Sequence, residues 1–315
     1  MRILFCGDAF PAAPRRLEQR LDAAHHQVIV APAEGIEAFV AGTDVAIPLM
    51  CRIDAALMDA GGFRLIHQWG AGLEGVDLEA AKNRGIQVAN VPTLGKNADS
   101  VAEHSILLAL AVLRQLPVAQ SSLQSRSLGA PLGRMLSGRT VCLYGLGAVA
   151  GAIARRLRSF DVRLVGITRD PGAPKVAVLG LDACYSTADR REALAQTDVL
   201  ILCVPLAPET EGIIDEGALA ALRPGAVVVN AARGALMDYN ALRAALESGH
   251  LGGAGLDVFW EEPFSPLDPL MALPNVIATP HIAGVTDGSY DQIADAVAAN
   301  IERLRLGEPL LNLAT

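Results

Sequence analysis

Three side chains suited to acid–base chemistry follow three consecutive apolar segments in the last third of the chain. Arg233 follows "AVVVNAA", Glu262 stands in the "FWEEP" that comes after "AGLDV", and His281 follows "NVIATP". A guanidinium fork can hold a carboxylate together with a carbonyl oxygen. An imidazole can protonate that oxygen, and a carboxylate on its other nitrogen orients the ring. The set suits hydride reduction of a 2-keto acid.

Each of these residues also has an ordinary structural explanation. Arg233 could form a surface salt bridge, Glu262 could be a turn residue before Pro263, and His281 could be a core histidine. Their placement favours the chemical interpretation, because ligands of an open parallel sheet bind beyond the carboxyl ends of its strands. We therefore predict that Arg233, Glu262 and His281 form one catalytic site.

A glycine loop precedes these segments. In "TVCLYGLGAVAGAIARRL" (140–157) a buried strand runs into Gly145 and Gly147 and then into a helix. Gly145 permits a tight turn, and Gly147 lets the backbone approach a pyrophosphate at the helix N-terminus. The third position of the motif is Ala150, which only has to pack closely. The pattern predicts a dinucleotide held by Gly145, Leu146, Gly147, Ala148 and Val149.

The end of the next strand, "VRLVGITRD" (162–170), predicts which dinucleotide binds. An acid there would bind the ribose 2′-hydroxyl of NAD. This chain instead has Thr168 and Arg169, which suit a 2′-phosphate, with Asp170 one residue further on. The sequence favours NADP and leaves NAD open.

The elements that must position these residues alternate between strands and helices. Strand-like segments separated by helical ones run from 2 to 91 and restart at "RTVCLYGLG", which predicts parallel sheets. Between them lies a helical pattern over 97–116, ended by Pro117. We predict one domain from 1–96 and 286–315 and a dinucleotide-binding domain from 97–285. The cleft between two such domains is the expected ligand site.

Composition excludes several classes of protein. With 51% hydrophobic and 19% charged residues, the 315-residue chain is globular rather than disordered. A net charge of −8 with scattered Lys and Arg argues against nucleic acid. The five cysteines show no metal-binding spacing and suit a reducing compartment, so no metal site is predicted. Because no apolar stretch approaches a membrane span or a signal peptide, we expect a cytoplasmic protein without a membrane partner.

Several motifs together resemble one family. "GAGLEGVDLEAAKNRGIQVANVP", "NADSVAEH", "LYGLGAVAGAIARRL", "NAARGALMD", "GLDVFWEEP" and "TPHIAG" stand in the order and spacing of D-isomer-specific 2-hydroxyacid dehydrogenases. The resemblance covers nearly the whole chain, and its motifs are highly specific. It implies an α/β fold of two doubly wound parallel-sheet domains, a Rossmann-type cofactor domain and a flavodoxin-like substrate domain, with the active site in the cleft between them.

The resemblance also assigns residues. It implies Arg233 as the substrate arginine, His281 as the acid/base, and Glu262, rather than Glu261, as its partner, because the family's glutamate directly precedes the proline. The backbone of Ala71 and Gly72 would bind the substrate carboxylate, and Asp257 the nicotinamide carboxamide. The remaining cofactor contacts that the resemblance implies are Cys203, Val204, Pro205, Thr210, Ala231, Arg233, His281 and Gly284.

Departures from the family pattern bear on the substrate. Pro48 stands near the place of an arginine found in phosphoglycerate-oxidising relatives, and no regulatory extension follows the last helix. These features favour a small acid such as glyoxylate or hydroxypyruvate. Formate-oxidising relatives pair the histidine with Gln, so Glu262 argues against formate. The alternatives are a phosphoglycerate dehydrogenase without a regulatory domain and a nucleotide-sensing corepressor-like protein. The apolar helix at 97–116 resembles the family's dimerisation region and implies a homodimer through the cofactor domain.

Overall fold

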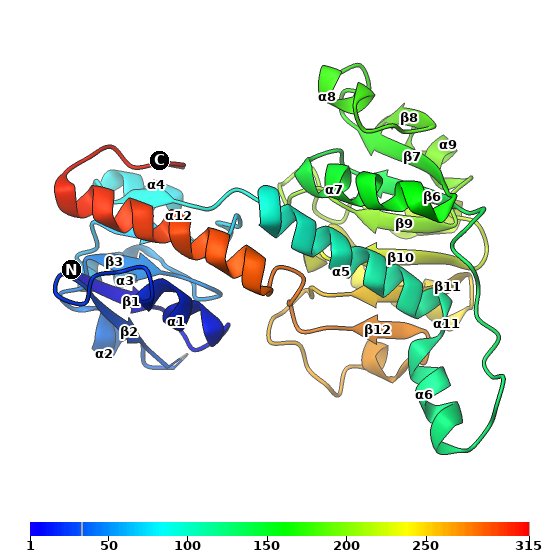
Figure 1. The fold of residues 1–315 in the computed structure, drawn as a ribbon, viewed down its shortest axis with the longest axis horizontal. Coiled ribbons are helices and arrows are strands. Elements are labelled where there is room, and N and C mark those ends of the chain that lie inside the picture. The colour runs from blue at the N-terminus through cyan, green and yellow to red at the C-terminus, as the bar shows by residue number, and fades with distance from the viewer. Residues whose placement is uncertain (33, 315) are drawn as a thin grey trace. The chain divides into compact units, whose positions relative to one another are not determined.

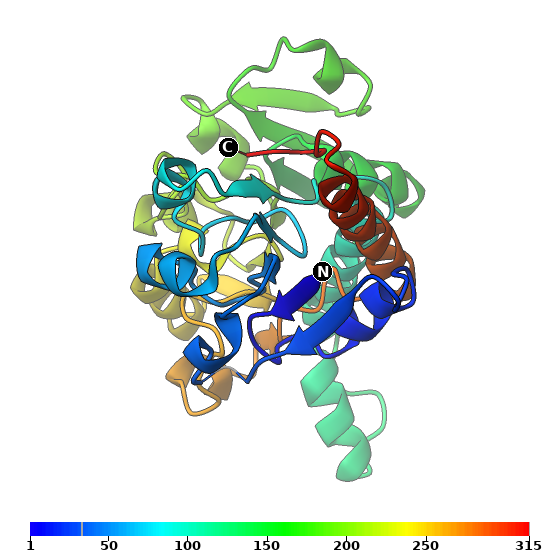
Figure 2. The same ribbon diagram turned by 90° about the vertical axis from the view of Figure 1, so that its left-hand side faces the viewer.

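The chain forms two compact units, each built around one parallel sheet. The computed structural model describes residues 1–32 and 34–314. Unit 1 comprises Met1–Asn97 and Val285–Thr315, and unit 2 comprises Ala98–Gly284. Figures 1 and 2 show helices beside the sheet of each unit. The predicted class, two parallel-sheet α/β domains, is confirmed.

Unit 1 contains a five-stranded sheet in the order β2-β1-β3-β4-β5. This is the flavodoxin-like order, in which the strand sequence reverses between β1 and β3. Its strands are β1 (Arg2–Phe5), β2 (Gln27–Val30), β3 (Val45–Ile47), β4 (Leu65–His67) and β5 (Gln87–Ala89). Its helices are α1 (Ala12–Glu18), α2 (Glu37–Val40), α3 (Ala55–Gly61), α4 (Leu78–Asn83) and α12 (Asp287–Leu306).

Unit 2 contains a seven-stranded sheet in the order β12-β11-β10-β9-β6-β7-β8. Its strands are β6 (Thr140–Tyr144), β7 (Arg163–Thr168), β8 (Ala183–Ser186), β9 (Val199–Leu202), β10 (Ala226–Asn230), β11 (Leu251–Leu256) and β12 (Val276–Ala278). Its helices are α6 (Leu116–Gln124), α7 (Ala148–Leu157), α8 (Pro174–Ala177), α9 (Arg190–Leu194), α10 (Glu216–Ala221) and α11 (Tyr239–Glu247), with most of α5 (Gly95–Leu113) and the 3₁₀ turns η1 (Arg158–Phe160), η2 (Gly234–Leu236) and η3 (Pro269–Ala272).

The inner strands β1 and β6 are continuous apolar runs because both faces of each sheet are covered. In β6, Cys142 and Tyr144 pack into one core cluster, whereas Val141 and Leu143 pack into the cluster on the opposite face. Burial on both faces selects aliphatic residues at every position rather than at alternate ones. The same alternation divides β1 between two clusters in unit 1.

The pairing register aligns the strand ends of unit 2. Across β6, β7 and β9 to β12, six residues share one line: Tyr144, Ile167, Leu202, Asn230, Leu256 and Ala278. The residues that directly follow them form what we call the strand-end row: Gly145, Thr168, Cys203, Ala231, Asp257 and Thr279. Since all these strands are parallel, the row lies along one edge of the sheet.

Two local predictions need correction. The helix expected over 97–116 ends at Leu113, and Pro117 lies in the first turn of the next helix, α6. A proline is tolerated there because its missing N–H would have no intrahelical partner. The sequence reading also missed β8, a half-exposed edge strand whose residues "ACYS" form no apolar run.

Among the described residues, no single helix is long and apolar enough to cross a bilayer. Taken together, α5 and α6 would be long and apolar enough, but these two helices are bent by 54° at the break between them.

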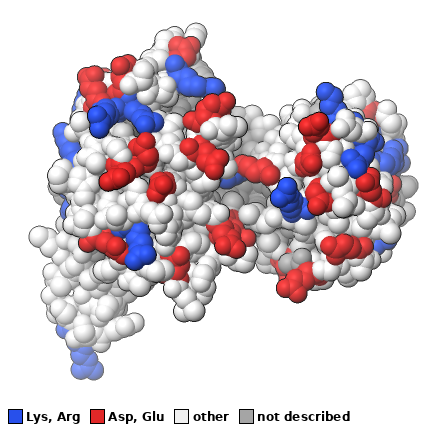
Figure 3. Space-filling view, turned by 180° about the vertical axis from the view of Figure 1, so that it is seen from behind, with Lys and Arg blue, Asp and Glu red and all other residues white. Residues whose placement is uncertain are grey.

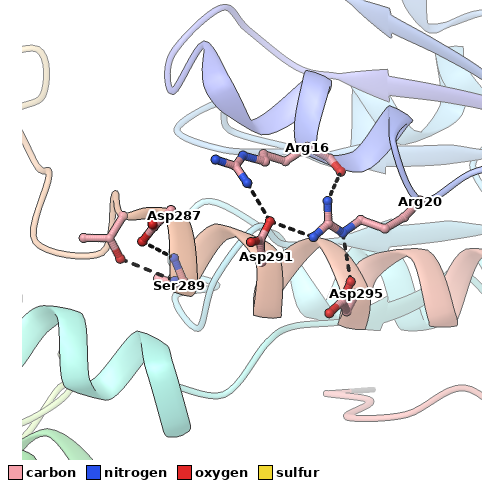
Figure 4. Close-up of polar contacts among 8 residues, drawn as sticks. Arg16, Arg20, Asp287, Ser289, Asp291 and Asp295 are labelled. Carbon is pink, nitrogen blue, oxygen red and sulfur yellow. Dashed lines mark hydrogen bonds and ion pairs between the residues drawn. The ribbon is translucent and has the colours of Figure 1, made fainter.

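A network of ion pairs joins α1 to α12 within unit 1 (Figure 4). Asp291 lies 2.7 Å from both Arg16 and Arg20, and Asp295 lies 2.8 Å from Arg20. Thr286 caps the start of α12 by accepting the Ser289 N–H at 3.4 Å. These contacts hold the last long helix of the chain against the first one.

Candidate active site

The pair predicted for proton transfer is formed in unit 2. His281 Nδ1 lies 2.7 Å from Glu262 Oε2, and the other carboxylate oxygen accepts the Phe259 N–H at 2.9 Å. The glutamate side chain is 16% exposed and the histidine side chain 30%. The carboxylate is thus fixed by the backbone and orients an imidazole that solvent still reaches.

The turn that carries Arg233 is shaped by Asn230, the last residue of β10. The Asn230 amide donates to the Arg233 carbonyl at 2.8 Å, and its oxygen accepts the Ala232 N–H at 3.0 Å. A Cβ on Gly234 would lie 2.0 Å from the Phe259 carbonyl carbon, so only glycine fits there. This close approach brings the turn of Arg233 against the segment that leads to Glu262.

Asp257, at the end of β11, is fully buried. Its carboxylate accepts the Thr279 hydroxyl at 2.6 Å, the Ile282 N–H at 2.8 Å and the Ala283 N–H at 2.7 Å. Burial raises the pKa of this carboxyl, but hydrogen bonds from His104, Thr279 and the two backbone amides outweigh that effect and lower the pKa below its usual value. Asp257 therefore binds the segment that carries His281, a role that the sequence did not predict.

The glycine loop fits a dinucleotide. Gly145 has φ +96°, and a Cβ there would lie 2.5 Å from Val204, so the turn requires glycine. Gly147 begins α7, which has no side-chain cap, and a Cβ at Gly147 would meet nothing within 4 Å. Leu146 is buried, while Ala148 and Val149 form the first turn of α7. Uncapped amides beside open space are what a pyrophosphate needs.

Thr168 and Arg169 lie at the end of β7, where the ribose specificity of such folds is set. Arg169 is exposed, as is Asp170. The Asp170 carboxylate accepts the Gly172 N–H at 3.0 Å and so closes its own turn. The Asp170 carboxylate is therefore engaged within its own turn.

The other predicted cofactor contacts lie at or just beyond the strand-end row. Cys203, Val204 and Pro205 follow β9, and the Thr210 hydroxyl closes that loop by donating to the Pro205 carbonyl at 2.8 Å. Ala231 follows β10, and Gly284 comes three residues after His281. The loops after β6 and β9 leave the sheet where the strand order reverses, which is where ligands of this architecture bind.

In unit 1, Ala71 and Gly72 lie in the loop after β4. The loop is held from behind: the Val91 N–H donates to the Gly70 carbonyl at 2.8 Å, and the Asn90 amide donates to the Ala71 carbonyl at 2.7 Å. With both carbonyls engaged, the loop has a fixed shape. Asn90 was missed at the sequence level, although its place directly after β5 was a signal.

Gln68 was missed as well. Its side-chain oxygen accepts the Trp69 N–H at 2.9 Å, and its amide donates to the Leu49 carbonyl at 3.1 Å. The side chain therefore ties the loop after β4 to the loop after β3. Nothing in the sequence distinguished this glutamine from a surface one.

Comparison with known proteins decides the family. The NAD binding domain profile of the D-isomer specific 2-hydroxyacid dehydrogenases matches residues 106–283. The chain belongs to this family.

Three relatives illustrate the range of the family. D-3-phosphoglycerate dehydrogenase of Mycobacterium tuberculosis is 36% identical over 259 residues, which cover 81% of this chain and 48% of that protein. The chain thus spans about half the length of the first curated relatives it matches. Glyoxylate reductase of Pyrococcus furiosus is 34% identical over 288 residues, covering 88% and 84%. The structure of an NADPH-dependent glyoxylate/hydroxypyruvate reductase from Sinorhizobium meliloti, in complex with NADP and malonate, superposes with a TM-score of 0.84 at 32% identity, covering 100% and 96%.

On the face drawn in Figure 3, acidic and basic side chains are interspersed and form no large basic patch. Within residues 1–32 and 34–314, no group of three or more His, Cys, Asp and Glu side chains could hold a metal ion.

Proposed function

We propose that the protein transfers a hydride between NAD(P)H and the keto group of a small 2-keto acid. The observation that carries this proposal is the hydrogen bond between His281 Nδ1 and Glu262 Oε2 in a chain of this family. With Nδ1 engaged by the carboxylate, Nε2 is the ring atom that gives its proton to the carbonyl oxygen. Glu262 stabilises the imidazolium before that transfer.

The Arg233 guanidinium would hold the substrate carboxylate and carbonyl oxygen, and the backbone N–H groups of Ala71 and Gly72 would receive the carboxylate. The nicotinamide supplies the hydride when bound. The residues proposed to hold the cofactor are Gly145, Leu146, Gly147, Ala148, Val149, Thr168, Arg169, Cys203, Val204, Pro205, Thr210, Ala231, Arg233, Asp257, His281 and Gly284.

For the dinucleotide we propose NADP. The support is the exposed Arg169 after β7, where a carboxylate would repel a 2′-phosphate. Asp170, the nearest carboxylate, is held by its own turn.

For the substrate we propose glyoxylate or hydroxypyruvate. Similarity to a glyoxylate reductase over 88% of this chain and 84% of that protein supports this choice, as does Pro48, which stands near the place of the arginine of phosphoglycerate-oxidising relatives. A phosphorylated substrate remains the alternative, because the phosphoglycerate dehydrogenases match at 36% identity over half of their length.

The test is a panel of 2-keto acids, including phosphohydroxypyruvate, assayed for oxidation of NADPH and NADH. We expect turnover of glyoxylate or hydroxypyruvate with NADPH, and a fall in kcat of about 10²- to 10⁴-fold in His281→Gln with NADPH binding retained. Absence of turnover with every acid would refute the enzymatic proposal and favour a nucleotide-sensing role. Better use of NADH would refute the cofactor choice alone.

We also propose a homodimer formed through α6 and the segment that follows it. In both ribbon views this arm extends away from the rest of unit 2. It exposes large apolar side chains that single molecules rarely leave in water: Leu116 (45%), Leu123 (76%), Leu128 (94%), Leu132 (90%) and Met135 (71%). Sedimentation of Leu123→Asp tests it, since a dimer should dissociate and a monomer should be unaffected.

The five free cysteines support a reducing, cytoplasmic location.

A further inference from the structure

One face of α5 carries four residues at i, i+4 spacing: Ser100, His104, Leu108 and Val112. Such residues lie in one stripe along a helix. The two apolar members pack on β11, where a Cβ on Gly255 would lie 2.8 Å from the Leu108 Cβ and one on Gly253 would lie 2.6 Å from Val112. The bare glycine backbone lets α5 approach the sheet closely, and Figure 1 shows the helix lying along β10 and β11.

The two polar members of the stripe reach the segment that carries His281. The Ser100 hydroxyl donates to the Ala283 carbonyl at 2.6 Å, and His104 Nε2 lies 2.8 Å from the Thr279 hydroxyl. Both contacts fall within two residues of His281, one on each side. The helix therefore grips the segment before and after the imidazole.

The direction of the hydrogen bonds follows from Asp257. Because its carboxylate is ionised, it only accepts, so the single Thr279 proton is donated to Asp257 Oδ1. The Thr279 oxygen must then accept from His104, which fixes the proton of that ring on Nε2. His104, Thr279 and Asp257 form one directed network, in which His104 Nε2 also lies 3.4 Å from Asp257 Oδ1, and Asp257 binds the Ile282 and Ala283 amides.

This hydrogen-bond network surrounds a residue with an unfavourable backbone conformation. His281 has φ +55°, in the left-handed region that a non-glycine residue rarely adopts. Its N–H donates to the Asp257 carbonyl at 2.8 Å. We propose that Ser100, His104 and Thr279 are positioning residues that hold the His281 turn in this conformation and thereby set the direction of the imidazole. The inference rests on the proposed function, because it assumes that His281 transfers the proton.

We call Ser100, His104 and Thr279 the clamp, and substitutions of Thr279 test it most directly. Thr279→Val keeps the shape of the side chain but removes the hydroxyl, whereas Thr279→Ser keeps the hydroxyl. We expect Thr279→Val and His104→Leu to lower kcat by about ten- to a hundredfold, with the KM for NADPH unchanged, since misplacing a catalytic group by 1 Å costs about that much. Thr279→Ser and His104→Gln, which retain the required donors, should recover most of the lost rate.

The matched control is Thr197→Val. Thr197 is fully buried in the same unit and donates to the Ala193 carbonyl, away from the His281 turn. Equal losses of kcat in Thr279→Val and Thr197→Val would overturn the clamp, as would a Thr279→Ser variant no better than Thr279→Val.

Amide hydrogen exchange of residues 279–284 gives a readout that needs no turnover. Faster exchange of Ile282 and Ala283 in Thr279→Val, but not in Thr279→Ser, supports the clamp, and unchanged exchange overturns it. If the wild-type protein reduces no keto acid, the proposed function fails, and this measurement still decides whether the clamp exists.

Discussion

His67 should make the stability of unit 1 depend on pH in the acid range. The side chain is completely buried at the end of β4, and burial lowers its pKa to about 4 despite a hydrogen bond to the Gln68 carbonyl. Nδ1 lies 3.1 Å from that carbonyl and Nε2 lies 3.0 Å from the Asn300 side-chain nitrogen. Since Asn300 donates, Nε2 must be unprotonated. A proton there would set two donors against each other.

The sign follows from the two states. The unfolded chain binds this proton with a pKa near 6.5 and the folded chain near 4, so the unfolded state holds more protons between these values. The contribution is fully present above pH 6.5 and is lost progressively as the pH falls to 4. Between pH 7.5 and pH 5 the loss amounts to about 2 kcal/mol of the free energy of unfolding, and it approaches about 3 kcal/mol below pH 4.

Urea unfolding at pH 7.5 and pH 5 measures this loss, with Trp69 as a fluorescent reporter in the same unit. His67→Gln should be less stable at both pH values but should lose about 2 kcal/mol less than the wild type on acidification. Every other ionisable group is common to the two proteins, so its contribution cancels in the difference. An equal loss in wild type and His67→Gln would refute the reasoning.

Three further predictions concern the site and its support. In Glu262→Gln, the side-chain oxygen should still accept the Phe259 N–H, so the NH₂ group would face His281 Nδ1 and oppose the imidazolium. We expect kcat to fall by about 10²- to 10⁴-fold. Steady-state kinetics that show a smaller effect than in Asp287→Asn, an exposed control, would contradict this. Asn90→Ala should raise the KM for the keto acid about three- to tenfold without changing the KM for NADPH, because one hydrogen bond to the Ala71 carbonyl is lost; Asn83→Ala, an exposed control in the same unit, should change neither. Gly255→Ala should destabilise unit 2 by about 1–3 kcal/mol, since its Cβ would lie 2.8 Å from the Leu108 Cβ; a melting temperature equal to that of Gly217→Ala, a substitution in the exposed turn of α10, would argue against close packing of α5.

Much of the architecture could be predicted because its signals are local. Apolar runs such as "VLIL" of β9 and the glycine turn after β6 each lie within a few residues. Local signals failed to predict two elements that have no distinctive local pattern. The short edge strand β8 lacks an apolar run. The break between α5 and α6 falls at Gln115, and its φ of +50° cannot be predicted from the residue types around it.

The candidate site shows the same division. The order of the motifs predicted which residues follow which strands, and so predicted Arg233, Glu262 and His281. It could not show that Asp257 also accepts backbone N–H groups of the His281 turn, because those hydrogen bonds depend on how the chain bends after β12.

The amino-acid sequence is enough to predict the class of fold, the glycine loop and the set of residues at the strand ends. These follow from residue type and from spacing along the chain. Only the tertiary structure decided which side chains support them: His104 meets Thr279 across 175 positions of sequence. That contact exists because α5 can approach β11 over bare glycines, and such packing between distant segments leaves no pattern in either segment alone.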